Sequence, residues 1–223
     1  MVQTRIDPFI QQALPDLRLG LVEAEDVEVR AHDPALWTML MELSERLRVE
    51  YKGKVAADRP EIAATRRAYR ALGDDPTRYR AANEALLRRV LSRHSLPQIN
   101  TIVDINNYIS LESGFSLGCY DLAHVQGAIV VRRGAPGEQY APIGKPEVDA
   151  ANRLALADDL GIFGSPTADS QRTMVTEAAR HTLFVVFAFE ASPEAVERSI
   201  AHVADLLTTF CKATIVGRQA LGG

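Results

Sequence analysis

Residues 97–122 read PQINTIVDINNYISLESGFSLGCYDL, and this segment says more about the fold than any other part of the chain. Its apolar side chains recur at helical spacing, which predicts a helix over residues 99–109. They are Ile99, Ile102, Val103 and Ile109. The amides of Asn100, Asn106 and Asn107 lie among them. Because a buried amide is costly without hydrogen-bond partners, these amides either fix a backbone turn or line a pocket.

Further helices are predicted upstream of this segment. Asp33 is a suitable N-cap and Pro34 suits the first helical position, so the first of them begins there. Its apolar stripe is formed by Leu36, Leu40, Leu43 and Leu47. Two more helices are predicted over residues 61–72, ended by Gly73, and over residues 83–91.

Downstream of residue 125 the pattern changes from helical to β. The predicted strands are 127–133 and 138–143, on either side of a turn at 134–137, with shorter ones at 154–157 and 162–163. The run Leu183 to Phe189 has no polar alternation, which is typical of a central strand buried on both faces.

The two ends of the chain also show regular patterns. Alternating Leu17, Leu19 and Leu21 predict a half-buried strand, with Val27 and Val29 as its continuation after a turn. Ser192 caps a final helix that we expect to span residues 192–217. Together the elements predict an α+β fold in which a mixed β-sheet packs with helices, with the helices early in the chain and the sheet late. We expect a single domain over residues 1–223, with a strand and helix segment at 1–55.

Length and composition exclude several classes of protein. The chain has 223 residues, of which 47% are hydrophobic and 24% charged, values that disfavour a disordered, collagen-like or coiled-coil chain. The longest apolar run, residues 182–189, is far shorter than the roughly 18 residues of a membrane span. The N-terminus shows no signal-peptide pattern, so we expect a cytoplasmic protein. Cys119 and Cys211 fit no metal spacing and are expected to be free thiols.

Charge is distributed unevenly along the chain. The net charge is −4. Residues 46–94 hold 13 Lys and Arg against 6 Asp and Glu, a charge of +7, which leaves −11 for the rest. Such asymmetry favours a polyanionic partner on one face, although solvated basic faces of helices would give the same count.

No common catalytic signature is present. The sequence contains no GxxxxGK[ST], GxGxxG, GxSxG or HExxH motif, and the five histidines have no ligand spacing. We therefore expect no metal or cofactor. The polar residues within 97–122 are the remaining candidates for a site.

In order and spacing, dipeptides of this segment resemble the B3/B4 region of the phenylalanyl-tRNA synthetase beta subunit. They are Pro97, Ile99-Asn100, Val103-Asp104, Asn107-Tyr108, Leu111-Glu112 and Tyr120-Asp121-Leu122. The resemblance continues through residues 129–132, Gly137-Glu138 and Ala157-Asp158, and covers about residues 66–189. It implies a B3/B4-like core over that range.

The resemblance also implies a function. A chain of this length is too short for the synthetase beta subunit, so it is similar to free-standing B3/B4 proteins and is not a complete synthetase. In the synthetase the region acts as a second sieve that hydrolyses mischarged tRNA, because a hydrophobic pocket rejects an added hydroxyl by only about 10². Such ester hydrolysis needs a positioned water and donors near the developing oxyanion, without a covalent nucleophile. The implied partner is tRNA or aminoacyl-tRNA.

The pocket residues of the family, compared one by one with the corresponding positions of this sequence, show both matches and differences. The Thr-Asn pair of the pocket falls on Asn106 and Asn107, which keeps the amide and loses the hydroxyl. The pocket histidine of the bacterial family falls on Gly118, and its tyrosine-reading glutamate falls on the strand at 185–186, where there is no carboxylate. These departures disfavour tyrosine editing by the bacterial mechanism.

Further candidates complete the predicted site. Glu112 and Asp121 would polarise a water or act as caps, and Arg172 and Thr173 would form the pocket wall or a polar loop. A glycine at 118 would enlarge the cavity or serve a turn. The predicted tRNA-binding residues are Arg66, Arg67, Arg70, Arg78 and Arg80, with Tyr69 and Tyr79 between them for base stacking.

Three functions follow as hypotheses. The first is a B3/B4 protein that binds aminoacyl-tRNA and deacylates it in trans, with Asn106 and Asn107 in the amino-acid pocket. The second is a non-catalytic module that binds RNA or an amino acid. The third is a hydrolase of a small amino-acid ester or amide, for which the basic segment has no role.

Overall fold

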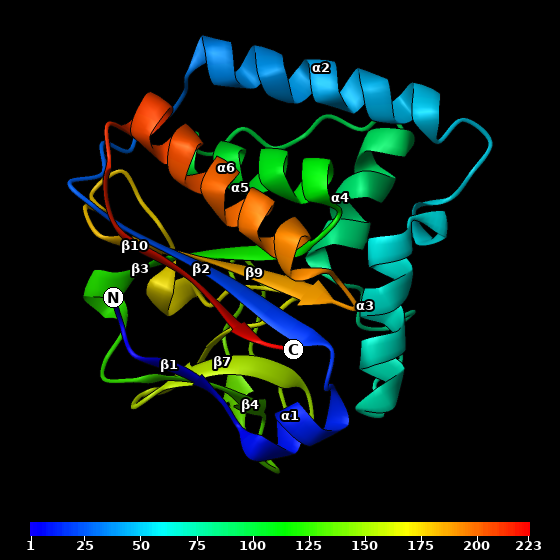
Figure 1. Ribbon diagram of the computed structural model, residues 1–223, viewed down its shortest axis with the longest axis vertical. Coiled ribbons are helices and arrows are strands. Elements are labelled where there is room, and N and C mark those ends of the chain that lie inside the picture. Colours follow the sequence, from blue (N-terminus) through cyan, green and yellow to red (C-terminus); the bar gives the residue numbers. More distant parts are fainter.

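The computed structural model describes residues 1–223 as an α+β fold with a helical layer and two four-stranded sheets (Figure 1). The helices are α1 (Pro8–Ala13), α2 (Pro34–Glu50), α3 (Pro60–Ala71), α4 (Ala82–Leu91), α5 (Thr101–Ser113) and α6 (Pro193–Cys211). The strands are β1 (Thr4–Ile6), β2 (Leu17–Glu25), β3 (Ser116–Asp121), β4 (Ile129–Arg133), β5 (Gln139–Tyr140), β6 (Val148–Asp149), β7 (Leu154–Asp158), β8 (Gly161–Gly164), β9 (Thr182–Phe189) and β10 (Thr214–Gly222).

The central sheet has the order β10-β2-β9-β3, and each neighbouring pair in it is antiparallel. Every residue of β9 is buried, which confirms the prediction of a central strand covered on both faces. Because successive side chains of a strand point to opposite faces, β9 contributes to two cores. Phe184 and Val186 face the helices, whereas Val185 and Phe187 face the second sheet.

The helical layer covers one face of the central sheet (Figure 1). Helices α5 and α6 pack on the sheet, and α2 packs on α5 on the side away from the sheet. The N-caps of α2 and α6 explain where these helices begin. Asp33 accepts hydrogen bonds from the backbone of Ala35 and Leu36 at 3.0 Å, and Ser192 accepts one from Ala195 at 3.2 Å. Gly114, in the left-handed conformation with φ of 81°, ends α5.

The second sheet, β1-β4-β7-β8, lies below the central sheet in Figure 1. β1 pairs with β4 in parallel, and the other pairs are antiparallel, so the protein contains the predicted mixed sheet. Helix α3 lies at the side of both sheets and contributes Ala64, Ala68 and Leu72 to the core between them. The short hairpin β5–β6 projects from this second layer as a separate two-stranded sheet.

The sequence predictions were wrong about several connections. The strands predicted at 127–133 and 138–143 flank a turn but do not pair with each other, because β4 pairs with β1 and β7, and β5 pairs with β6. The final helix ends at Cys211, where Lys212 adopts a positive φ of 51°, and β10 follows where helix was expected. Val27 and Val29 are buried but lie outside β2. The early strands β1 and β2 pair with late ones, so the chain is not divided into helices first and sheet later.

Two simpler expectations are answered by the structure. Cys119 and Cys211 are both free, as predicted, and the structure places both in the interior. None of the helices combines the length and the apolar character of a membrane span.

Candidate functional site

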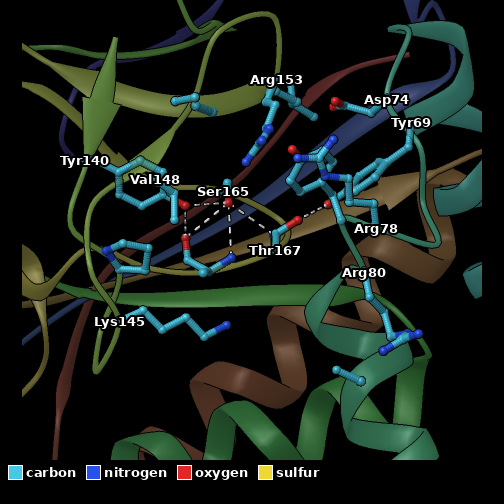
Figure 2. A pocket seen from close by; sticks show the side chains of 17 residues that line it. Tyr69, Asp74, Arg78, Arg80, Tyr140, Lys145, Val148, Arg153, Ser165 and Thr167 are labelled. Atoms are coloured by element: carbon cyan, nitrogen blue, oxygen red, sulfur yellow. Dashed lines mark hydrogen bonds between the residues drawn. The ribbon is translucent and has the colours of Figure 1, made fainter. Parts of the chain in front are cut away.

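A cavity of about 350 Å³ lies between the β5–β6 hairpin, the chain after β8 and the connection from α3 to α4 (Figure 2). Its size falls within the range of about 300–1,000 Å³ that is common for small-molecule sites. Its polar wall is formed by Tyr69, Asp74, Arg78, Tyr79, Arg80, Tyr140, Lys145, Arg153, Ser165 and Thr167. Alanines and other small apolar residues complete the wall, among them Ala85, Ala150, Ala155 and Ala168.

Four cationic side chains line this cavity, and three of them have no carboxylate partner. Arg80 pairs with Glu84 at 3.4 Å. Arg78, Lys145 and Arg153 take part in none of the ion pairs of the protein. In Figure 2 Lys145 reaches in from the hairpin, with Arg153 and Arg78 on the other sides. Unpaired cations around a concave space favour an anionic ligand.

Tyr79 holds two of these guanidinium groups. The Arg153 Cζ lies 3.4 Å from the centroid of the Tyr79 ring, and the Arg78 Cζ lies 5.1 Å from it. Cation–π contacts of this kind orient the guanidinium without using its N–H donors. Both groups therefore remain free to donate hydrogen bonds to a ligand.

Four hydroxyl groups of the cavity, those of Tyr69, Tyr140, Ser165 and Thr167, are already engaged within the protein. The Tyr69 and Thr167 hydroxyls lie 2.8 Å apart, and the Tyr140 hydroxyl donates to the Ala168 carbonyl at 3.1 Å. Ser165 Oγ accepts from the backbone of Thr167 and donates to the Ala168 carbonyl at 3.1 Å. These bonds fix the shape of the wall, and none of the hydroxyls is paired with a base as a nucleophile would be.

Asp74 is the one carboxylate that lines the cavity. Burial raises its pKa above the ordinary value, and the charges of Arg153 and Arg133 oppose that shift. A partly desolvated carboxylate of raised pKa is a better proton acceptor than a fully solvated one. Asp74 is therefore the cavity's candidate for holding a water or an ammonium group.

A groove of about 480 Å³ adjoins the cavity on the α4 side. Its cationic residues are Lys54, Arg66 and Arg88. Glu84, which is 3% exposed, lies at the junction and binds both Arg66 at 2.8 Å and Arg80 at 3.4 Å. Because Arg80 also lines the cavity, the two concave surfaces meet at this ion-pair cluster.

The predicted tRNA-binding arginines have different environments in the structure. Arg78 and Arg80 line the cavity, and Arg66 lines the groove while paired with Glu84. Arg67 pairs with Glu190 at 2.6 Å. Arg70 is exposed on α3.

The predicted amide pocket lies away from this cavity. Asn106 and Asn107 are half-buried on α5, in the helical layer, and neither lines the cavity. Asn106 Oδ1 is buried without a hydrogen-bond partner. Glu112, near the end of the same helix, lies 2.7 Å from His202 of α6.

The remaining predicted residues serve local contacts. Asp121 accepts from Ala123 N at 3.1 Å and so caps a short turn of 3₁₀ helix. Arg172 forms a bidentate pair with Asp158 at 2.8 Å, and the Thr173 hydroxyl donates to the Phe163 carbonyl. The space over Gly118 is filled by the ring of Tyr120, so this glycine does not enlarge a cavity.

Sequence reasoning missed Tyr140, Lys145, Arg153, Ser165 and Thr167. They lie on the β5–β6 hairpin and in connections, where hydrophobic periodicity carries no signal. Lys145 and Arg153 stand among turn residues, and nothing in the local sequence places them beside residues 69–85.

One cluster elsewhere has ligand atoms suited to a metal. Carboxylate and imidazole atoms of Glu23, Glu25 and His181 lie within 4.8 Å of one another. Glu23 is already bound by the backbone N–H of Val2 at 2.5 Å and by His181 at 2.9 Å. These contacts explain the cluster without an ion.

Comparison with known proteins gives a consistent result. The sequence model of the B3/4 domain family matches residues 64–212. The phenylalanine–tRNA ligase beta subunit of Chromobacterium violaceum is 37% identical over 123 residues, which are 52% of this chain and 15% of that protein. The corresponding subunit of Sodalis glossinidius is 30% identical over 179 residues, 72% of this chain and 21% of that protein.

The chain thus spans only a small part of the length of these curated relatives. A solved structure, an N-terminal fragment of the phenylalanyl-tRNA synthetase beta subunit from Pyrococcus horikoshii, covers 100% of this chain with a TM-score of 0.49 and 13% identity. That match includes 55% of the fragment.

Proposed function

Because this chain belongs to the B3/4 domain family, we propose that it binds the aminoacylated 3′ end of a tRNA in the cation-lined cavity and hydrolyses the ester there. The observation that supports this best is the set of unpaired cations, Arg78, Lys145 and Arg153, around a space of about 350 Å³. A neutral ligand would leave these charges without partners, whereas a phosphate of the terminal nucleotide would bind them.

The adjoining groove suggests where the preceding nucleotides lie. Its residues Lys54 and Arg88 are exposed, and the groove meets the cavity at Arg80. An RNA strand that enters the cavity would place its last phosphates along this basic groove. The basic segment 46–94 supplies the cations of the groove and two of the four in the cavity.

The chemistry requires a held water and donors for the oxyanion. In the proposed step Asp74 accepts a proton from water as the water oxygen attacks the ester carbonyl, and a guanidinium of the cavity stabilises the negative charge on the carbonyl oxygen. The tetrahedral intermediate then collapses, the ester C–O bond breaks, and Asp74 returns the proton to the ribose oxygen. The products are the free amino acid and tRNA with its terminal hydroxyl restored.

The amide pair on α5 is a second candidate contact for the amino acid. Asn106 Oδ1 has no hydrogen-bond partner within the protein, and Asn107 is half-buried beside it in the sequence. Glu112, Gly118, Asp121, Arg172 and Thr173 remain predictions of the family resemblance, and their internal contacts in the structure already explain them. We therefore rank the cation-lined cavity first.

A non-catalytic binding module is the second candidate function. It is favoured by the hydroxyl groups of Tyr69, Tyr140, Ser165 and Thr167, which are engaged in hydrogen bonds within the protein. In that case the cations would bind RNA and Asp74 would hold the ammonium group of an amino acid, without turnover.

The deciding experiment is deacylation of a panel of mischarged tRNAs by the full chain. Asp74→Asn tests the proposed base, Arg153→Gln the anion site and Asn107→Ala the α5 pocket. Arg198→Gln on α6 is a matched control, because Arg198 is exposed in the helical layer and forms no ion pair.

The outcomes separate the candidates. Turnover that falls at least 100-fold in Asp74→Asn with binding retained supports hydrolysis in this cavity. Binding that is lost in Arg153→Gln, with no turnover by any variant, supports the binding module. Turnover that is lost only in Asn107→Ala moves the site to α5, and absence of both binding and turnover contradicts the proposed function.

A further inference from the structure

The buried phenol of Tyr120 occupies a slot between the two sheets. Tyr120 lies on β3, is 0% exposed, and packs edge-on against Phe163 with ring centroids 5.0 Å apart. Its hydroxyl donates to Asp169 Oδ1 at 2.6 Å. A buried hydroxyl of this kind needs such a partner, and Asp169 is its one hydrogen-bond partner in the structure.

Two glycines make this position possible. A Cβ atom at Gly118, two residues earlier on the same strand, would lie 2.6 Å from Tyr120 Cζ and 2.9 Å from Asp169 Oδ1. A Cβ atom at Gly164, the last residue of β8, would lie 2.6 Å from Tyr120 Cε1. Real Cβ atoms do not approach other atoms so closely. The absence of side chains at both positions is therefore what allows the phenol to reach Asp169.

Asp169 has no cationic partner. Its carboxylate accepts a hydrogen bond from the Tyr120 hydroxyl of β3, and burial raises its pKa to about 7. Its role is thus to tie its own segment to the central sheet. Asp169 does not line the cavity, so its side chain is not expected to contact a ligand there.

The backbone around Asp169 carries the wall of the cavity. The Asp169 carbonyl accepts from Ile143 N of the hairpin loop at 3.0 Å, and Gln171 N donates to the Ala141 carbonyl at 2.9 Å. The preceding residue, Ala168, lines the cavity, and its carbonyl accepts from Ser165 and from Tyr140 at 3.1 Å. The side chain of Asp169 thus lies where the 165–168 segment and the hairpin are joined.

We infer that Tyr120 and Asp169 form a positioning pair that fixes residues 165–171 and the β5–β6 hairpin, and with them the ligand-binding shape of the cavity. The inference rests on the proposed function only in taking the cavity as the ligand site. Neither residue touches the ligand. Loss of the phenol hydroxyl removes the side-chain hydrogen bond of the carboxylate and releases the wall from β3.

The test compares Tyr120→Phe and Asp169→Asn with Tyr51→Phe in the full chain. Tyr120→Phe keeps the ring and removes only the hydroxyl, and Asp169→Asn keeps an oxygen acceptor for it. Tyr51 is a buried tyrosine in the helical core, and its Phe variant controls for loss of a phenol. The readouts are backbone amide exchange of residues 139–143 and 165–171, and affinity for the probe adenosine 5′-monophosphate.

In Tyr120→Phe we expect amide exchange of both segments to rise about 10- to 100-fold, in line with loss of a hydrogen bond to a charged group. Probe affinity should fall by a similar factor. Asp169→Asn should give smaller changes, and Tyr51→Phe should leave both segments unchanged. Unaltered exchange in Tyr120→Phe, or an equal rise in Tyr51→Phe, overturns the inference. If amide exchange rises in Tyr120→Phe but the wild type does not bind the probe, the positioning pair is supported. The proposed function is then contradicted.

Discussion

The carboxyl group of Asp104 lies in the core of the helical layer, 0% exposed, with no hydrogen-bond partner for either oxygen. Burial raises its pKa from 3.8 to about 6. Between these two values the native state keeps the proton while the unfolded chain releases it, so this group lowers stability as pH rises from about 4 to about 6. Above about pH 6 the carboxyl is charged in both states, and the full free-energy cost of the buried charge lowers the stability of the native state.

Asp104→Asn should therefore stabilise the protein at pH 7.5 by about 1–3 kcal/mol, because the amide is neutral at every pH and avoids the cost of the buried charge that raises this pKa. At pH 4 the advantage should disappear, because the wild-type carboxyl is then neutral. Urea unfolding of both proteins at pH 4, 5, 6 and 7.5 measures the difference. A gap of the same size at every pH would show that the charge of Asp104 is not its cause.

Gly118 gives a second prediction about one position. An alanine there brings a Cβ against the phenol of Tyr120, and the ring cannot move aside because Gly164 and Phe163 enclose it. Gly118→Ala should destabilise the fold by about 1–3 kcal/mol, as overpacking of a core does. Thermal and urea unfolding check it. A variant as stable as the wild type would mean that the ring has room that the distances do not show.

The N-cap of α2 shows how a single side chain determines where a helix begins. Asp33 binds the N–H groups of Ala35 and Leu36, which lowers the pKa of its carboxyl, with help from Arg30 at 2.8 Å. Asp33→Ala should cost about 1 kcal/mol near neutral pH. Because a lowered pKa contributes stability that is lost as pH falls, the cost should shrink toward pH 3. Unfolding at pH 7 and pH 3, with Ser192→Ala at the uncharged cap of α6 as control, tests both statements.

Helices and the buried strand were predictable because their signals are local. Caps and apolar stripes located α2 and the start of α6, and the unbroken run 183–189 identified β9. The pairing of β4 was not predictable, because turn residues at 134–137 suggest a hairpin although the partners of β4 are distant strands. Pairing depends on which distant apolar faces meet, and no local pattern carries that information.

The same distinction explains the candidate site. Arg78 and Arg80 were found because they lie in a conspicuously basic segment, whereas Lys145 and Arg153 come from a hairpin and a connection far along the chain. The cavity exists only where these segments meet. Family resemblance supplied the fold but pointed to α5, since it transfers positions in sequence and cannot show that Tyr120 fills the space at Gly118.

At the level of the entire chain, charge separation is the feature with a direct consequence for binding. The +7 segment 46–94 folds into the end of α2 and into α3 and α4, beside the cavity, while the rest of the chain carries −11. Arg66 and Arg67 are neutralised by Glu84 and Glu190, whereas Lys54 and Arg88 in the groove and Arg78 in the cavity are unpaired and available to a ligand. A polyanionic strand would contact the cations of the groove and then those of the cavity, whereas a small ligand would contact only those in the cavity.

This difference predicts the salt dependence of binding. An RNA 3′ end that contacts about five phosphates should lose roughly 10²-fold in affinity between 50 and 200 mM salt, since each contact to a single strand adds about −0.7 to the slope of log K against log salt concentration. Arg88→Gln in the groove should weaken binding and make that slope shallower by about 0.7, and Arg198→Gln on α6 should leave both unchanged. Fluorescence anisotropy with a labelled tRNA over a salt series measures the slopes. An affinity that does not depend on salt, together with wild-type binding by Arg88→Gln, would contradict this prediction. The ligand would then be a small molecule bound in the cavity alone, and the cations of the groove would contact only solvent.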